Sequence, residues 1–490
     1  MQKFDNKKLF INFIDYIKKH SILSLFFCFL IFYFTIGLYL CFFNDIIATY
    51  WDILFDSDSR LVYEIIKSNY YPLVNVFKHP FIVIILKPFW LLFTALFHST
   101  RVGGLFLQAL LGSSTVCLVY SIVNKLTNRK NLALCLALIY GLSMSTITFS
   151  VIYELYIYTA FFNTLLLYYV LLLWKNDNPI KNIDYFILSL LTVFNLGTTI
   201  ITFITSFILI IFLFIRKKQT IKNFLLFIFY VVILYFLNLF ILKLGHPNYN
   251  VTKTFEVFPF YNFDYNLNRF LLALKTTFIQ SLYGLKLEEN IVHKSSKGIF
   301  FSENQSSVLY IPSLFLFTAA FWGFIKNLKI LKSSIALPII LIVIIHIFEC
   351  YFYNTKFSFL FSQNILPLLT VLIGILYSKF SDKFINIFCS LFIFWQCIIN
   401  FQIIAYIAKY VQLRSLVQLG FCSNYGLHVY LMYSLISVLL LSILVFIIKK
   451  NILKDIWKLT PENKIQIFTE LAFIYMIIVS IFYVIFQGRI

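Results

Sequence analysis

Acidic residues gather in a polar stretch that follows the first long apolar run of the chain. The stretch reads NDIIATYWDILFDSDSRLVYEIIKSNYYPLVNVFKHPF and contains Asp56 and Asp58, which are separated by one serine. A partly desolvated carboxylate at the end of a spanning helix is suited to accept a proton, as a general base does. A solvated acidic loop has the same composition. Asp56 and Asp58 are therefore candidate bases, and neither is preferred by spacing alone.

Glu154 is a second acidic candidate, in the segment FSVIYELYIYTAFF between two apolar runs. A carboxylate in so short and apolar a turn is costly unless it is paired or used. An exposed carboxylate at the surface of the turn is the alternative interpretation. We expect Glu154 to lie on the same side of the membrane as the first acidic stretch.

Basic residues near these acids are candidates for binding a phosphate. Lys78 and His79 precede Pro80 at the start of an apolar segment, where free backbone donors could help to hold an anion. They would otherwise anchor that segment at the lipid headgroups. Arg269 and Lys356 are further bases on the same predicted side. His346 and Glu349 are spaced to share a helix face, where they would pair or line a cavity.

The composition indicates which elements position these residues. Of 490 residues, 61% are hydrophobic and only 12% are charged, whereas a soluble domain is nearer a quarter charged. Apolar runs of about 20 residues recur along the whole chain, as in a protein that crosses a bilayer many times. The net charge of +20 comes from Lys and Arg spread over short loops, which does not indicate nucleic-acid binding. The eight cysteines show no metal-ligand spacing.

The sequence predicts an all-α polytopic membrane protein, a single transmembrane domain over 1–490 with about thirteen spanning helices. The predicted spans are 21–43, 103–123, 131–149, 157–174, 184–196, 199–215, 223–243, 308–325, 334–352, 364–378, 384–404, 427–448 and 467–487. The short pair at 184–215 should form a tight hairpin. The first run follows a basic start and has no small-residue cleavage site, so we expect a retained helix.

The apolar segment 80–97 decides the topology. Lys87 and Pro88 lie in its middle, and a Lys at the bilayer centre costs about 3 kcal/mol. If the segment lies in the interface, 24 of the 40 Lys and Arg residues fall in cytoplasmic segments; if it spans, 19 of those 24 move outside. The positive-inside rule favours an interfacial helix.

This topology places the N-terminus in the cytoplasm and the protein in the cell (inner) membrane. It leaves two large extracytoplasmic loops, 44–102 with the interfacial helix and 244–307. Asp56, Asp58, His79 and Glu154 then lie on one outer face.

The pattern resembles the GT-C superfamily of multi-spanning glycosyltransferases, which is related to protein O-mannosyltransferases and aminoarabinose transferases. In that pattern an outer loop with one or two acids carries an Asp followed five residues later by Tyr, which Asp58 and Tyr63 match. An HP dipeptide then opens an interfacial helix, as His79-Pro80 does. A later span ends at an outer acid, which Glu154 matches. The resemblance covers residues 1–220 well and the rest only by layout.

The resemblance implies transfer of a sugar from a polyprenyl-phosphate-linked donor to an outer acceptor, with inversion. Asp58, or Asp56 in its place, would be the base, and Glu154 a further catalytic acid. Tyr63, Lys78, His79, Arg269 and Lys356 would bind substrate, with no cofactor. We expect no metal, although Asp56 and Asp58 could bind one if the oligosaccharyltransferase type of the superfamily were the right comparison. The acceptor would be a glycan, lipid or protein, as in polysaccharide biosynthesis of the cell envelope. Alternatives are a transporter or flippase for lipid-linked sugars, and a non-catalytic membrane protein of the same fold.

Overall fold

A computed structural model describes most of the chain between residues 21 and 419. The described residues are 21–42, 54–55, 59–67, 82–199, 202–245, 266–284, 287–293, 296–301, 310–326, 335–353 and 358–419. The predicted spans at 427–448 and 467–487 lie outside them.

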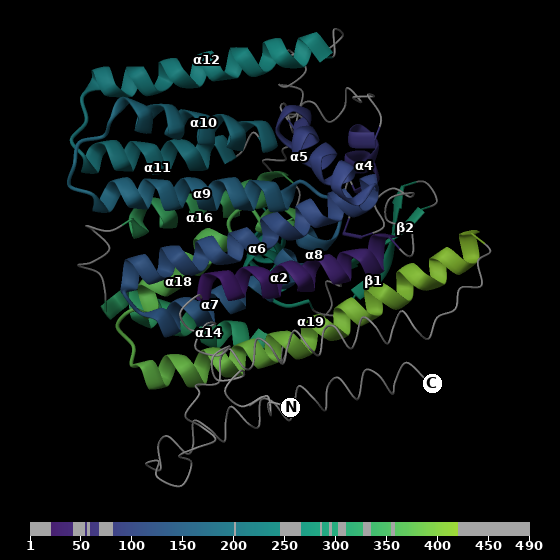
Figure 1. The fold of residues 1–490 in the computed structure, drawn as a ribbon. Coiled ribbons are helices and arrows are strands. Elements are labelled where there is room, and N and C mark those ends of the chain that lie inside the picture. The colour runs from purple at the N-terminus through teal and green to yellow at the C-terminus, as the bar shows by residue number, and fades with distance from the viewer. Residues whose placement is uncertain are drawn as a thin grey trace, which may run out of the picture.

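Helices make up nearly all of the described chain, which confirms the predominantly helical fold (Figure 1). In its first half they are α2 (Ser21–Gly37), the π-helix η1 (Leu38–Phe42), α4 (Ser59–Lys67), α5 (Ile82–Phe97), α6 (Thr100–Thr127), α7 (Lys130–Gly141), α8 (Met144–Val151), α9 (Tyr156–Lys175), α10 (Asn182–Thr198), α11 (Thr202–Arg216) and α12 (Ile221–Gly245). In its second half they are α13 (Leu267–Lys275), η3 (Thr276–Gln280), α14 (Ile311–Lys326), α16 (Ala336–Tyr353), α17 (Ser358–Ser362), α18 (Leu366–Tyr377) and α19 (Asp382–Leu419).

Five of the described helices are long and apolar enough to cross a bilayer, namely α2, α6, α9, α12 and α19. The pair α7 and α8 counts as a sixth if it is one bent span, and several other apolar helices are shorter. These helices support a multi-pass membrane protein, while the count of thirteen stays a prediction. The helix α6 is the centre of the bundle and packs against α2, α5, α7, α8, α9 and α18.

The predicted span 131–149 is broken in two. The axes of α7 and α8 differ in direction by 59°, and Leu142 and Ser143 form the break. The Ser143 side chain caps α8 by accepting the N–H of Thr146. A hydroxyl at the N-cap replaces a hydrogen bond that the preceding helix can no longer supply. The break turns α8 toward the segment that carries Glu154.

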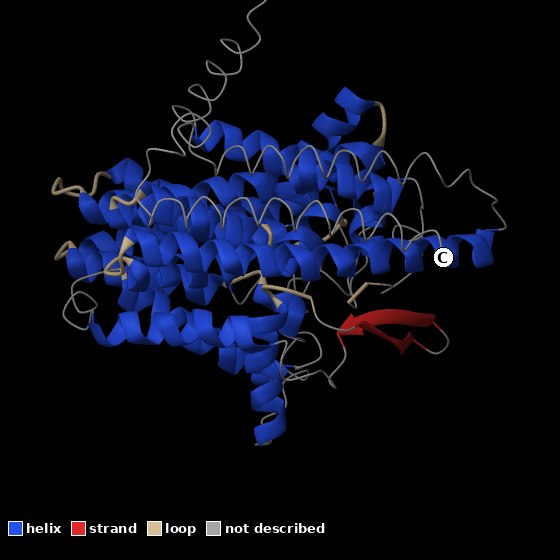
Figure 2. Cartoon of the chain, turned by 90° about the horizontal axis from the view of Figure 1, so that it is seen from below, coloured by secondary structure: helices blue, strands red, loops and turns tan. Residues whose placement is uncertain are grey.

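A β-hairpin in the second predicted loop departs from the all-α prediction. Strands β1 (Leu287–His293) and β2 (Ser296–Phe301) pair antiparallel, with Leu287 opposite Phe301. Figure 2 shows this pair at the edge of the helical bundle. The sequence signal was weak because the strands are short and only one face is apolar, with Ile299 and Phe301 buried.

The helix α5 crosses α6 close to its beginning. The indole N–H of Trp90 donates to the carbonyl of Thr100 at 2.7 Å, and the rings of Phe93 and Phe97 both contact Phe106. These contacts involve two turns of α5 but only the first two turns of α6. Two helices that ran side by side would stay in contact along a longer stretch of α6. This crossing favours a surface position for α5, and its place at the lipid interface stays a prediction.

Basic turns gather at the end of the bundle opposite to α4, α5 and the hairpin (Figure 1). The Lys175 ammonium donates to the carbonyl of Lys125, which joins the ends of α9 and α6. The Arg129 guanidinium pairs with Asp382 at the start of α19. The chain thus has one basic end and one end that carries Glu154.

Candidate active site

Glu154 lies in the short connection between α8 and α9. It is 2% exposed, so the interpretation as an exposed turn is wrong. Its carboxylate oxygen Oε1 accepts the N–H of Leu155 at 2.8 Å, and its backbone carbonyl accepts Nε2 of Gln108 at 2.8 Å. The carboxylate thus lies at the N-terminal end of α9, where the helix dipole is positive.

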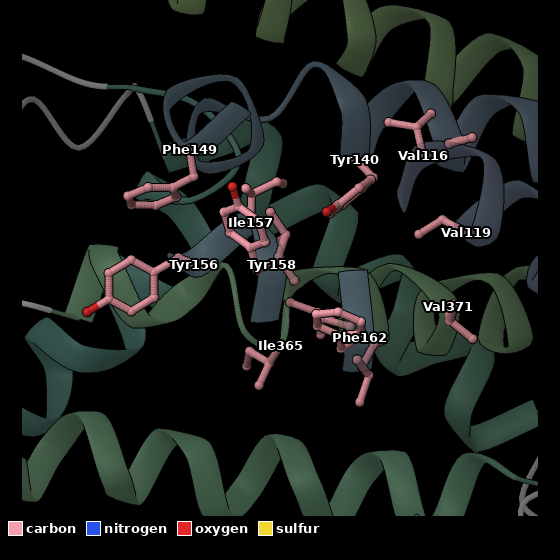
Figure 3. Close-up of a cluster of buried hydrophobic side chains, with 14 of the residues drawn as sticks. Val116, Val119, Tyr140, Phe149, Tyr156, Ile157, Tyr158, Phe162, Ile365 and Val371 are labelled. Atoms are coloured by element: carbon pink, nitrogen blue, oxygen red, sulfur yellow. The ribbon is translucent and has the colours of Figure 1, made fainter. Parts of the chain in front are cut away.

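The connection keeps its position because α8 is anchored at its other end. The backbone N–H groups of Met144 and Ser145 donate to the carbonyls of Leu282 and Ser281, at 3.1 and 3.0 Å. The amide of Gln363 bridges Tyr140 and Ser145, at 2.9 Å to each. Figure 3 shows the side chains of Tyr140, Tyr158 and Phe162 pointing into one buried cluster below this connection. The helix α8, which leads to Glu154, is therefore held by hydrogen bonds to residues 281–282 and to Gln363.

Three aromatic rings cover the connection, and we call Tyr63, Trp90 and Tyr153 the outer aromatic cluster. The rings of Tyr63 and Tyr153 lie 5.4 Å apart between centroids, and those of Trp90 and Tyr153 stack at 5.6 Å. Tyr63 comes from α4, Trp90 from α5, and Tyr153 directly precedes Glu154. The cluster thus brings the helix of the first loop onto the turn that carries the buried acid.

Arg101 adds a positive charge to this cluster and was not among the predicted site residues. Its guanidinium lies 5.8 Å from the centroid of the Tyr63 ring, in cation–π range. It stands in the first turn of α6, and its backbone carbonyl accepts the Tyr153 hydroxyl at 3.3 Å. The signal in the sequence that could have pointed to Arg101 was a basic residue at the start of an otherwise apolar helix. Sequence reasoning missed it because the Tyr63 partner lies far away in the chain.

Phe55 and Ser59, the described residues that flank Asp56 and Asp58, are both buried, at 3% and 2% exposure. The Phe55 N–H donates to the carbonyl of Ile299 in β2 at 2.9 Å. Phe55 has a φ of 54°, in the left-handed region that a bulky residue rarely adopts. Such strain persists only where surrounding contacts fix the backbone, and it is common near functional sites.

The ring of Phe55 packs between the second loop and the bundle. It lies 4.8 Å from Phe301 of β2 and 4.8 Å from Phe359 of α17, measured between ring centroids. Phe301 and Phe359 are also 4.8 Å apart, so the three rings contact one another. Phe55, the residue before Asp56 in the first predicted outer loop, is therefore in direct contact with the second predicted outer loop.

The remaining predicted site residues have different outcomes. Arg269, in α13, donates from its guanidinium to the carbonyl of Tyr351 at 3.2 Å, at the C-terminal end of α16. A guanidinium there complements the negative end of the helix dipole. Five predicted site residues lie outside the described residues, namely Asp56, Asp58, Lys78, His79 and Lys356. Of the predicted set, Tyr63 and Glu154 are brought together, since Tyr63 contacts the neighbour of Glu154.

Comparisons with known proteins find one distant structural likeness. No family model matches the chain, and a search of curated proteins finds no relative. Among solved structures, the crystal structure of ArnT from Cupriavidus metallidurans in the apo state is similar with a TM-score of 0.40 and 10% identity. The alignment covers 96% of this chain and 76% of that one. A likeness this distant assigns neither a family nor an activity, so function has to be inferred from the residues themselves.

Proposed function

We propose that the chain is a membrane glycosyltransferase of the GT-C type that works at its acidic end. It would transfer a sugar from a polyprenyl-phosphate-linked donor to an acceptor hydroxyl, with inversion at the anomeric carbon. The observation that carries the proposal is the contact between Tyr63 and Tyr153 at 5.4 Å. Through it the helix that directly follows Asp58 packs on the turn of the buried Glu154. The helix α4, which begins at Ser59, thereby packs at the end of the bundle that carries Glu154.

The proposed reaction needs a base and a cation. Asp58, with Asp56 as the substitute, takes the proton from the acceptor hydroxyl as that oxygen attacks the anomeric carbon. The bond from that carbon to the donor phosphate breaks, and the leaving phosphate gains negative charge. Arg101 at the start of α6 would stabilise this charge, helped by the positive end of the α6 helix dipole. Lys78, His79, Arg269 and Lys356 remain proposed contacts of the donor.

A lipid-linked donor suits the position of this site. The outer aromatic cluster lies where an apolar helix, α5, meets the end of the spanning helix α6. The helix α5 exposes Phe89, Leu92 and Leu96 on its other side. A donor with its lipid tail in the bilayer and its phosphate at the interface would reach a site here without leaving the membrane.

The test measures polyprenyl phosphate, the one product that is the same for every acceptor. The full chain is reconstituted in lipid vesicles with a panel of polyprenyl-phosphate sugars and crude envelope acceptors, and release of polyprenyl phosphate is followed by mass spectrometry. We expect turnover with at least one donor, and a loss of at least about 100-fold in Asp58→Asn, the size of a general-base contribution. Asp177→Asn, the same change at an exposed residue of the opposite end, serves as the control and should be active.

Turnover that is unchanged in both Asp56→Asn and Asp58→Asn would overturn the assignment of the base. Absence of release from every donor would overturn the transferase itself. Either result is interpretable because folding of each variant is checked by size-exclusion profile before assay.

A transporter or flippase for lipid-linked sugars is the second candidate. The span broken between α7 and α8, and the charged pair His346 and Glu349 inside α16, favour it, because transporters use broken helices and charges within the membrane. Movement of a fluorescent lipid-linked sugar across proteoliposomes without any acceptor would distinguish it. A protein inactive in both assays would fit a non-catalytic member of the fold.

A further inference from the structure

An apolar groove lies on the side of the bundle, between the start of α2 and the helices α6 and α9. Its walls include Ile22 and Phe26 of α2, Ser114 and Ser121 of α6, and Leu165 of α9, and its volume is about 680 Å³. All three helices are long and apolar enough to cross a bilayer. Ile22 is 47% exposed, so the groove opens at the surface of these helices, where lipid would surround them.

The serine and cysteine side chains of the groove are hydrogen-bonded within the bundle. The hydroxyls of Ser114 and Ser121 donate to the carbonyls of Leu110 and Cys117 in their own helix, both at 2.7 Å. The Cys117 thiol donates to the carbonyl of Ile22 at 3.3 Å, which joins α6 to the start of α2. Because these donors are already paired, a hydrocarbon chain can fill the groove without leaving them unsatisfied.

Two lysines continue the walls of the groove toward the basic end of the bundle. Lys125 follows Ser121 by one turn of α6, and Lys175 follows Tyr168 by two turns of α9. Residues at these spacings share a helix face, so both lysines stand above the groove. The Lys175 ammonium donates to the backbone carbonyl of Lys125, which places the two residues side by side. An ammonium has three N–H donors, so Lys175 keeps two for a ligand.

Acidic residues do not neutralise this pair of lysines within the described part of the chain. At this end Asp382 pairs with Arg129, and Asp184 caps the start of α10. Among the described residues, no carboxylate forms an ion pair with Lys125 or Lys175. Two such positive charges favour a headgroup with a net negative charge over a zwitterionic one.

The length of the groove corresponds to one leaflet of a bilayer. The rise from Ser114 to Lys125 is about 16 Å along α6, at 1.5 Å per residue. Half of a hydrocarbon core is about 15 Å thick. A lipid whose phosphate lies at Lys125 would therefore have room for one acyl chain along the groove. The groove uses the second half of α6, whereas the outer aromatic cluster lies at the start of that helix.

We propose that this groove binds one anionic phospholipid from the leaflet at the basic end. The ammonium groups of Lys125 and Lys175 hold its phosphate, and one of its acyl chains lies between α2, α6 and α9. Basic pockets between spanning helices bind anionic headgroups on the cytoplasmic side of membranes. The site lies at the opposite end of the bundle from the proposed transfer site and needs no sugar donor.

The test follows lipid binding to the purified full chain by native mass spectrometry. The protein is delipidated in detergent and titrated with dipalmitoyl phosphatidylglycerol or dipalmitoyl phosphatidylcholine, which have the same acyl chains and differ in headgroup charge. We expect one phosphatidylglycerol per chain to bind at least about fivefold more tightly than phosphatidylcholine, the factor that one lysine contributes near an anionic headgroup.

Lysine variants test the headgroup contact. Lys125→Gln combined with Lys175→Gln removes both charges, so this double variant should bind the two lipids with equal affinity. Lys218→Gln combined with Lys222→Gln is the matched control. It removes two exposed charges from the same end, beside α12 rather than beside the groove, and it should retain the preference for phosphatidylglycerol.

Ser114→Phe tests the acyl-chain contact. The phenyl ring would fill the end of the groove that lies farthest from Lys125. Wild type should prefer dipalmitoyl over dilauroyl phosphatidylglycerol, because burial of each further CH₂ group adds to affinity. In Ser114→Phe this preference should fall at least about threefold, which is less than the contribution of one buried CH₂ group. The preference for phosphatidylglycerol over phosphatidylcholine should remain.

Equal affinity of the wild type for the two headgroups would overturn the proposal, and so would a preference that persists without Lys125 and Lys175. Tighter binding of a polyprenyl phosphate than of phosphatidylglycerol would overturn it and assign the groove to the donor lipid. Absence of any bound lipid would also overturn it and leave the groove to another segment of the chain, such as residues 1–20. None of these measurements depends on sugar transfer, so the result is independent of the proposed activity.

Discussion

Glu154 shows how a carboxylate is stabilised inside an apolar bundle. It accepts the N–H of Leu155 at the start of α9, and its own carbonyl is held by Gln108 of α6. A negative charge at a helix N-terminus gains about 0.3–1 kcal/mol from the dipole, and more where it is partly buried. These contacts offset part of the cost of burial. They also fix the carboxylate next to Tyr153, where the outer aromatic cluster covers it.

Glu154→Gln separates the role of the charge from the role of the hydrogen bond. The amide oxygen of Gln can still accept the Leu155 N–H, so we expect a change in unfolding free energy within about 1 kcal/mol. If the charge serves transfer, the rate of polyprenyl-phosphate release should fall at least about tenfold, which corresponds to 1.4 kcal/mol. Thermal unfolding and the transfer assay together check this. A fully active, equally stable Glu154→Gln would show that the charge serves neither purpose.

The sequence predicted individual site residues unevenly. Glu154 could be singled out because an acid between two apolar runs is costly unless it is paired or used, and its role in the site stays a prediction. Arg101 was not recognised, because its significance comes from the Tyr63 ring, which reaches it only through the packing of α4. Arg269 was chosen as an isolated outer base, and only the fold shows that it caps α16 at Tyr351. Long-range contacts of this kind leave no local pattern in one sequence.

Among the helices, the broken span α7–α8 contributes most to the position of the turn that carries Glu154. An unbroken helix over 131–149 would point its end away from the connection to α9, whereas the 59° bend carries α8 back into the bundle. All eight residues of α8 are buried, including its serines and threonines. The polar groups exposed by the break find partners in Leu282, Ser281 and Gln363. The bend is therefore stabilised by segments far away in the chain.

Gln363→Leu tests this stabilisation. The Gln363 side chain accepts the hydroxyls of Ser145 and Thr146 and donates to the Tyr140 hydroxyl. Leucine at this position removes the acceptor of the Ser145 and Thr146 hydroxyl protons and the donor to Tyr140, at a cost of about 2–4 kcal/mol. Unfolding in graded denaturing detergent should show this loss. Equal stability of Gln363→Leu and the wild type would contradict this account of the bend.

Spanning helices were predictable because each must present about 20 apolar residues to lipid, and this leaves a clear signal. The predicted run 21–43 matches α2 and η1, and the short hairpin 184–215 matches α10 and α11. The break at Leu142 and Ser143 was not predicted, because the residues of the segment GLSMS are small and do not interrupt the run from which a helix is predicted. The helix α19 reaches Leu419, well past the predicted end at residue 404. Its boundary was missed because residues such as Lys409 and Arg414 end the apolar run from which a span is predicted, while the helix continues beyond it.

At the scale of the whole molecule, the two ends of the bundle differ in charge and in shape. One end carries the basic turns, joined by contacts such as Lys217 with the carbonyl of Asn176. The other carries Glu154, the outer aromatic cluster and the β-hairpin. Positive residues are retained on the cytoplasmic side of membranes, so the second end is predicted to face outward.

Cysteine labelling tests this orientation. Glu289, on the hairpin, and Asp177, in the turn between α9 and α10, are both exposed, whereas the described native cysteines are buried or half-buried. In intact cells, Glu289→Cys should react with a membrane-impermeant maleimide, and Asp177→Cys should react only after permeabilisation. Labelling extent by gel shift gives the answer. The reverse pattern would place the proposed site in the cytoplasm, where nucleotide sugars are available and the need for a lipid-linked donor disappears.

The contact between Phe55 and β2 has a consequence for biogenesis. Membrane proteins are synthesised and inserted from the N-terminus onward. Ile299, whose carbonyl accepts the Phe55 N–H, is synthesised long after Phe55. The contact can therefore form only after the helices α6 to α12 have been synthesised. The end of the bundle that carries Glu154 is thus completed late in synthesis, and a chain truncated before β2 would lack this contact.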